Sequence, residues 1–126
     1  MRIDHIALWT HDLERLRAFY ESYFGAVSGP RYENPRKQFQ SYFLRFESGA
    51  RVELMQRPGL SPAVPGPCVG YAHLAVAVGS EREVDQLTAR LARDGYPVLD
   101  GPRRTGDGYY ESVIADPDGN SIEITV

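Results

Sequence analysis

Two histidines and two glutamates, His5, Glu53, His73 and Glu123, are the residues of this chain whose types and spacing suggest chemistry. The stretch from His5 to Glu53 is nearly as long as the stretch from His73 to Glu123, and each residue lies in a segment predicted to be a β-strand. Imidazole nitrogens and carboxylate oxygens together form a ligand set that suits a divalent transition metal. The spacing therefore predicts a metal site assembled from two copies of one module.

The elements that must position these residues are predicted in the same order twice. The order βαβββ is expected in residues 1–57 and again in residues 71–126, joined by a linker at 58–70 that contains four prolines and three glycines. Apolar alternation predicts strands at 3–9, 27–32, 39–47, 51–57, 71–78, 97–102, 109–115 and 121–125. Capping residues and terminal glycines predict helices at 13–24 and at 81–94. The predicted fold class is α+β, in a single domain that spans residues 1–126.

Strand alternation places the four polar residues on one side of each predicted sheet. His5 lies opposite its apolar neighbours in the strand, and the same holds for Glu53, His73 and Glu123. All four side chains therefore leave the face that a helix would cover. Two carboxylates that share a concave face would repel each other and lose hydration, so a bound cation is favoured there.

Composition limits the possible functions. The chain has 126 residues, enough for one core without disulfides, and a net charge of −3 from 14 basic and 17 acidic residues. This balance provides no basic surface, so no nucleic-acid partner is expected. The single cysteine, Cys68, lies in the linker without a nearby base and is predicted to be inert. No stretch resembles a signal peptide or a membrane span, and a cytoplasmic location is expected.

Several motifs mark a known pattern: His5-Ile6-Ala7-Leu8, then His73-Leu74-Ala75-Val76, then the turn at 116–120, Asp-Pro-Asp-Gly-Asn, shortly before Glu123. With the duplication, these motifs resemble the vicinal oxygen chelate superfamily, which includes glyoxalase I, extradiol dioxygenases, epimerases and bleomycin-resistance proteins. The resemblance covers essentially the whole chain. It implies that the paired βαβββ modules form a curved, cleft-forming mixed sheet.

The order His, Glu, His, Glu is similar to that of bacterial glyoxalase I. The resemblance implies that His5, Glu53, His73 and Glu123 bind one divalent metal, which can be Ni, Co, Mn, Zn or Fe. It also implies that Glu53 or Glu123 is the catalytic base, and that the protein is a homodimer with sites at the interface. The reaction would convert a thiol adduct of a 2-oxoaldehyde into a 2-hydroxyacyl thioester.

The residues expected to contact substrate differ from those of the family. Bacterial glyoxalase I has an arginine at the position of Trp9, and the asparagine that follows its first glutamate is not matched here. The glutathione anchors are therefore absent. Trp9 provides a flat apolar surface. Strand alternation places Phe43 on the same face as the four polar residues, where it would line the cleft, and Arg57 is placed to receive an anionic group. These three residues are the predicted substrate contacts, for a small molecule that is not assigned.

Three alternatives from the same superfamily remain open. An epimerase that acts beside a thioester would use nearly the same proton chemistry. An extradiol dioxygenase would use Fe(II) with two histidines and one carboxylate, and the additional Glu53 argues against it. A drug-binding protein of the bleomycin-resistance type would not need the four ligands and would bind its ligand without metal.

Overall fold

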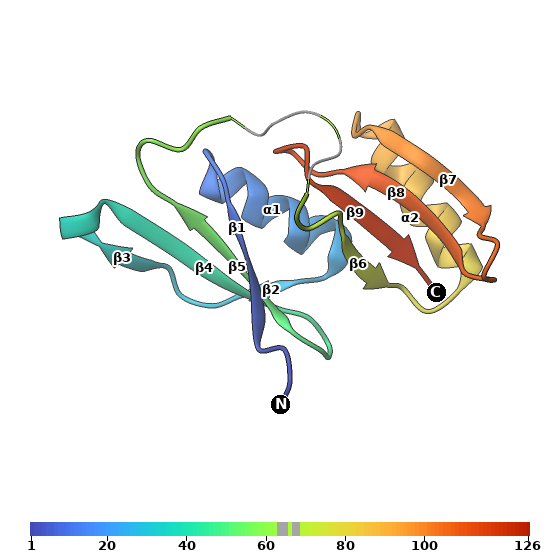
Figure 1. Ribbon diagram of the computed structural model, residues 1–126, viewed down its shortest axis with the longest axis horizontal. Helices are drawn as coiled ribbons and strands as arrows, with labels where there is room; N and C mark the ends of the chain where they lie inside the picture. The colour runs from blue at the N-terminus through green and yellow to red at the C-terminus, as the bar shows by residue number, and fades with distance from the viewer. Residues whose placement is uncertain (63–65, 67–68) are drawn as a thin grey trace. The chain divides into compact units, whose positions relative to one another are not determined.

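The computed structural model describes residues 1–62, 66 and 69–126, and it divides the chain into two compact units, Met1–Pro62 and Ala63–Val126 (Figure 1). The boundary between the units falls inside the predicted linker. Each unit combines one mixed sheet with one α-helix, which confirms the α+β class and the repeated module. Cys68 lies outside the described residues. Among the described residues, no helix is long and apolar enough to cross a membrane.

The first unit contains a five-stranded sheet. Its elements are β1 (His5–Trp9), α1 (Leu13–Phe24), β2 (Val27–Ser28), β3 (Tyr32–Asn34), the 3-10 turn η1 (Pro35–Lys37), β4 (Phe39–Arg45) and β5 (Arg51–Gln56). The strand order is β1-β5-β4-β2, with β3 also paired to β4. β1 is parallel to β5, and the other pairs are antiparallel. The first and last strands of the unit are therefore neighbours.

The second unit repeats this arrangement with four strands. Its elements are β6 (Leu74–Ala77), α2 (Glu81–Arg93), β7 (Val98–Arg104), β8 (Tyr110–Ala115) and β9 (Ser121–Thr125). The strand order is β6-β9-β8-β7, and β6 is parallel to β9. The first and last strands are again neighbours, so each unit brings the segment that contains its histidine beside the strand that contains its glutamate.

Two local predictions were wrong. The single strand expected at 27–32 is divided into β2 and β3, and η1 follows because the Asn34 side chain accepts a hydrogen bond from the backbone N–H of Lys37. The strand expected at 71–78 begins only at Leu74, because its pairing with β9 starts at Leu74 opposite Ile122. His73 therefore lies one residue before the strand rather than inside it.

One face of each sheet is covered by the helix of the same unit. In the first unit the buried side chains are those of Leu13, Leu16, Phe19, Tyr20, Leu44, Val52 and Leu54. In the second unit they are those of Val84, Thr88, Leu91, Ser112, Ile114, Ile122 and Ile124. Full burial of one such aliphatic side chain contributes about 2 kcal/mol. The opposite face of each sheet, called the open face below, carries the candidate functional residues.

Candidate metal centre

In each unit the glutamate lies in a row of three residues across the open face. The register gives Ala7, Glu53 and Phe43 in the first unit and Ala75, Glu123 and Val113 in the second. Alternate residues of a strand share a face, so each row lies opposite the buried residues of the same strands. An alanine stands beside the glutamate in both rows, and its small side chain leaves space next to the carboxylate.

Each glutamate is close to the histidine of its own unit. His5 Nε2 lies 3.9 Å from Glu53 Oε2, and His73 Nε2 lies 3.4 Å from Glu123 Oε2. The histidine side chains are 39% and 43% exposed, whereas the glutamates are 16% and 18% exposed. The carboxylates are thus mostly shielded from solvent, and the imidazoles are accessible to an incoming ion.

These distances can be compared with the geometry of a metal-binding pair. Two ligand atoms bound to one ion at about 2.1 Å lie about 3.0 to 3.4 Å apart, depending on the coordination angle. The His73–Glu123 separation falls within this range. The His5–Glu53 separation, at 3.9 Å, is longer than this range. Each unit therefore has two candidate donor atoms, and those of the second unit have the spacing that fits one divalent ion.

Asp4 orients the histidine of the first unit. Its carboxylate lies 2.9 Å from His5 Nδ1 and also forms an ion pair with Arg51. Hydrogen bonds from His5 and Arg51 lower the pKa of Asp4 below its ordinary value. A neutral imidazole that donates from Nδ1 keeps the lone pair of Nε2 free, on the side of Glu53, which is the arrangement typical of metal-binding histidines.

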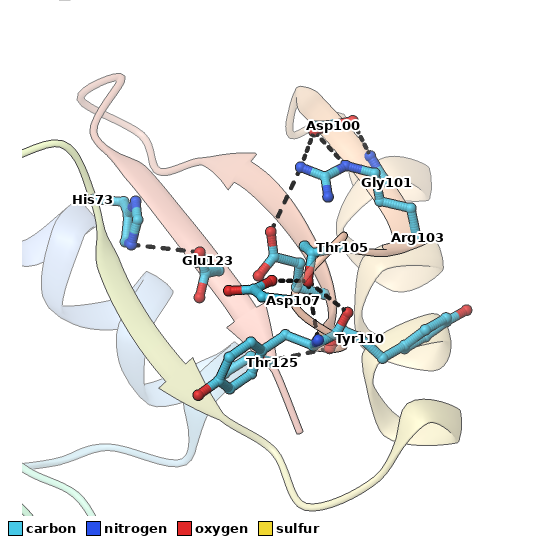
Figure 2. Close-up of polar contacts among 11 residues, drawn as sticks. His73, Asp100, Gly101, Arg103, Thr105, Asp107, Tyr110, Glu123 and Thr125 are labelled. Carbon is cyan, nitrogen blue, oxygen red and sulfur yellow. Dashed lines mark hydrogen bonds and ion pairs between the residues drawn. The ribbon is translucent and has the colours of Figure 1, made fainter.

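The second unit surrounds its pair differently. Figure 2 shows His73 turned toward Glu123, with Arg103 beside Asp100 on the neighbouring part of the sheet. Arg103 pairs with Asp100 at 2.7 Å and lies 3.5 Å from Glu111. The hydrogen bond to Asp100, together with the charges of Glu111 and Glu123, raises the pKa of the Arg103 guanidinium. A fixed positive charge therefore lies near the carboxylate of this unit.

A distortion of β7 places Arg103 in this position. The register of β7 against β8 shifts between Asp100 and Arg103, and Gly101 in between adopts a φ of +76°. A Cβ atom at Gly101 would lie 2.6 Å from the carbonyl oxygen of Glu111, so this close approach requires glycine. The distortion moves Arg103 opposite Glu111, one residue from the register that Asp100 and Val113 set.

The predicted turn before Glu123 is held by one buried carboxylate. Asp116 accepts hydrogen bonds from the backbone N–H groups of Asp118 and Asn120 and from the Asn120 side chain. Burial raises the pKa of Asp116, and the hydrogen bonds from Asn120 oppose this shift. The turn fixes the start of β9 and therefore the position of Glu123 in its row.

The three predicted substrate contacts all belong to the first unit. The Arg57 guanidinium lies over the Trp9 ring at 4.8 Å, so these two residues are together. Phe43 contacts the ring of His5 edge to face at 5.2 Å, and Arg51 lies 4.5 Å from its centroid. Phe43 therefore packs against His5, one of the predicted ligands, whereas Trp9 and Arg57 lie further along the open face.

The structure brings the four predicted ligands together as two pairs, one in each unit. Within the part of the chain that the structure describes, no group of three or more His, Cys, Asp and Glu side chains forms a metal cluster. Sequence reasoning missed Asp4 and Arg103. Asp4 directly precedes His5, which is a usable signal, whereas the position of Arg103 depends on the irregular register of β7.

Comparisons with known proteins agree with this fold. Residues 2–124 match the model of the Glyoxalase/Bleomycin resistance protein/Dioxygenase superfamily. The uncharacterized protein YqjT of Bacillus subtilis is 31% identical over 123 residues, which cover 95% of this chain and 94% of that protein. A lactoylglutathione lyase of Haemophilus influenzae is 28% identical over 130 residues, covering 98% of this chain and 90% of the lyase.

Among solved structures, glyoxalase I of Zea mays superposes with a TM-score of 0.82 at 24% identity. The match covers 98% of this chain and 44% of the maize chain, so this chain corresponds to less than half of that enzyme. At this identity the likeness concerns the fold alone. Since the family model covers nearly the whole sequence, the chain belongs to the Glyoxalase/Bleomycin resistance protein/Dioxygenase superfamily.

Proposed function

We propose that this protein is a metal-dependent lyase of the glyoxalase I type, in which His5, Glu53, His73 and Glu123 together bind one divalent metal ion. Ni, Co, Mn, Zn and Fe are the candidate ions, because all of them accept imidazole and carboxylate ligands. The observation that carries the proposal is the repeated pair, with a histidine nitrogen 3.9 Å or 3.4 Å from a shielded carboxylate oxygen in each unit.

The proposal treats residues 1–126 as one functional domain, since four ligands require both units. It also includes a homodimer, in which the two pairs that complete one site can come from different chains, and a cytoplasmic location. The lactoylglutathione lyase of Haemophilus influenzae supports the enzyme class, because its similarity extends over 98% of this chain.

A bound divalent metal would supply Lewis-acid stabilisation of the negative charge that develops on two adjacent substrate oxygens. Glu53 or Glu123 would take the proton from the carbon that bears the thiol and deliver it to the neighbouring carbonyl carbon. The proton removed equals the proton returned, so the reaction is an isomerisation that needs no further reactant. The shielding of both carboxylates supports this role, because it limits exchange of the proton with water.

The site residues also limit the substrate. Trp9 replaces a charged anchor by a flat apolar surface, Phe43 packs on His5, and Arg57 lies over Trp9. The proposed substrate is a small molecule with two adjacent oxygens, such as a thiol adduct of a 2-oxoaldehyde, whose thiol differs from glutathione.

Metal analysis of the purified protein and two variants tests the proposal. We expect Glu123→Gln to lower metal content strongly, whereas Glu111→Gln, which alters a comparably shielded carboxylate on the same open face, leaves metal content unchanged. Metal-free protein is then reloaded with each candidate ion and assayed with methylglyoxal and a panel of thiols. If Glu123→Gln contains as much metal as Glu111→Gln, the proposed metal site is wrong. If no ion and thiol give turnover, the lyase assignment is wrong.

A further inference from the structure

An exposed aromatic cluster lies on the open face of the first unit, one row away from Glu53. The register aligns Trp9, Met55, Ser41 and Tyr32 across four neighbouring strands, directly beside the row that contains Glu53. Phe39 lies two residues before Ser41 on the same face of β4. We call Trp9, Phe39 and Tyr32 the aromatic cluster.

The three rings of the aromatic cluster contact one another but remain accessible. The Trp9 and Phe39 centroids are 6.2 Å apart with the rings nearly perpendicular, and the Phe39 and Tyr32 centroids are 6.1 Å apart. Trp9 is nevertheless 43% exposed, and Tyr32 is 55% exposed. Large aromatic rings that are left open on one face of a sheet are typical of a surface that binds a ligand.

Arg57 adds a positive charge to the aromatic cluster. Its guanidinium lies 4.8 Å from the centroid of Trp9, and no carboxylate of the described residues lies within ion-pair distance of it. Two other arginines of this unit are neutralised, since Arg31 pairs with Glu33 and Arg51 with Asp4. The charge of Arg57 is therefore available to an anion that also contacts the Trp9 ring.

A cavity adjoins the aromatic cluster. It has a volume of about 380 Å³, and its lining residues are Glu33, Asn34, Pro35, Gln38, Phe39, Gln40 and Pro58. The Glu33 carboxylate is paired with Arg31. This volume lies within the range of about 300 to 1,000 Å³ that is typical of small-molecule sites. The Phe39 ring, amide groups and an arginine-paired carboxylate thus line one hollow that belongs entirely to the first unit.

We propose that the aromatic cluster, Arg57 and the adjoining cavity bind a planar aromatic or unsaturated group that carries a carboxylate. The ring of the ligand would pack against Trp9 and Phe39, and its carboxylate would pair with the Arg57 guanidinium. Two residues along a strand span roughly 7 Å, so this group lies one or two such steps from Glu53. The inference rests on the proposed function in one respect, because it makes this group the non-reacting part of the same substrate.

Fluorescence of Trp9 tests the inference directly, because Trp9 is the only tryptophan of the chain. Metal-free protein is titrated with benzoate, with benzyl alcohol, which lacks the carboxylate, and with acetate, which lacks the ring. We expect benzoate to change the indole emission and to bind at least about tenfold more tightly than either partial probe.

Two variants of exposed arginines on this sheet separate a specific contact from a general charge effect. Arg57→Gln is expected to weaken benzoate binding about tenfold. Arg45→Gln, which removes a charge at the far end of the open face of β4, is expected to leave binding unchanged. A third variant, Tyr32→Ser, alters an exposed ring and is expected to weaken benzoate binding without affecting folding.

The outcomes distinguish this inference from the proposed function. Absence of an emission change, equal binding of benzoate and benzyl alcohol, or equal loss in the Arg57 and Arg45 variants would overturn the inference while leaving metal binding intact. The inference would also be overturned if the Trp9 emission changed when the protein is diluted but not when benzoate is added. That result would mean that a second copy of the chain covers the rings. Loss of the metal site with normal benzoate binding would overturn only the lyase assignment.

Discussion

In the first unit, Glu53 lies between Ala7 and Phe43, next to exposed aromatic rings and to Arg57, which has no carboxylate partner among the described residues. In the second unit, Glu123 lies in the same place of the same strand order, but its surroundings are the ion pairs of Arg103. The two histidines differ as well. Asp4 lies against His5 Nδ1, whereas position 72, which precedes His73, is alanine, and His73 has no hydrogen bond to Nδ1 among the described residues.

This difference shows which features of the repeated module are shared and which have diverged. The shared features are the parallel pairing of first and last strands, the alanine beside each glutamate, and a histidine nitrogen close to the glutamate, at 3.9 Å in one unit and 3.4 Å in the other. The diverged features lie one row away, where one unit has aromatic rings and the other has charges. Under the proposed function, metal binding would depend on what the units have in common, and substrate recognition would depend on where they differ.

The largest expected effect tests whether the two units unfold together. Ile124 is fully buried in the second unit, and Ile124→Ala should destabilise the protein by about 3 kcal/mol because it leaves a cavity in the core. If the units form one domain, the unfolding transition seen by Trp9, which lies in the first unit, shifts by the same amount as the transition seen by circular dichroism.

Leu54→Ala provides the matched control for that prediction. Leu54 is equally buried and belongs to the first unit, so its variant should shift the Trp9 transition in every case. A Trp9 transition that moves with Leu54→Ala but not with Ile124→Ala would show that the units are separate folding domains, and the comparison would then concern two independent modules.

The two hairpin turns that precede the glutamates give the next prediction. Asp116 is buried and accepts three hydrogen bonds, whereas Ser48 in the turn before β5 is exposed. Asp116→Ala should cost about 2 kcal/mol because buried donors lose their acceptor, and Ser48→Ala should change stability by less than about 0.5 kcal/mol. Chemical denaturation measures both, and similar losses would mean that the Asp116 hydrogen bonds do not fix the turn.

A smaller effect is expected from the residue before each histidine. Asp4→Ala makes the first unit resemble the second at this position, and it should weaken metal binding about tenfold because the His5 ring is no longer oriented. The nitrogen chemical shifts of the His5 ring, measured without metal, should also move toward a mixture of tautomers. Arg2→Gln removes the exposed positive charge that lies 3.9 Å from Asp4 but keeps the Asp4–His5 contact, so it serves as the control. The same loss of metal affinity in both variants would show that the Asp4–His5 contact does not orient the ring.

Most of the fold was predictable because its signals are local. The helix at 13–24 was predicted by Asp12 and Gly25, and the structure shows Asp12 capping the backbone N–H of Arg15 and Gly25 in the left-handed conformation. Strand parity also predicted the open faces that carry Glu53 and Glu123. The division of 27–32 was not predictable in the same way, because it depends on pairing with β4 and on the η1 turn that follows.

The positions of the candidate residues on the open faces were predictable, but their surroundings were less so. Residue type and spacing identified the two His–Glu pairs, since both are encoded in the repeat. The contact of Trp9 with Phe39, and the approach of Arg103 to Glu111, result from side-chain packing and from an irregular register in β7. Such features depend on neighbouring strands that are distant in sequence, and no local pattern reports them.

Metal stoichiometry tests the central claim, that the two pairs bind one ion together. Titration calorimetry with Co²⁺ compares the wild-type protein with the double variant His73→Ala/Glu123→Ala, which keeps His5 and Glu53 intact. The account predicts one ion per chain in the wild type and loss of tight binding in the variant, because two ligands alone hold the ion weakly. Two ions per chain in the wild type, or an unchanged affinity in the variant, would contradict it.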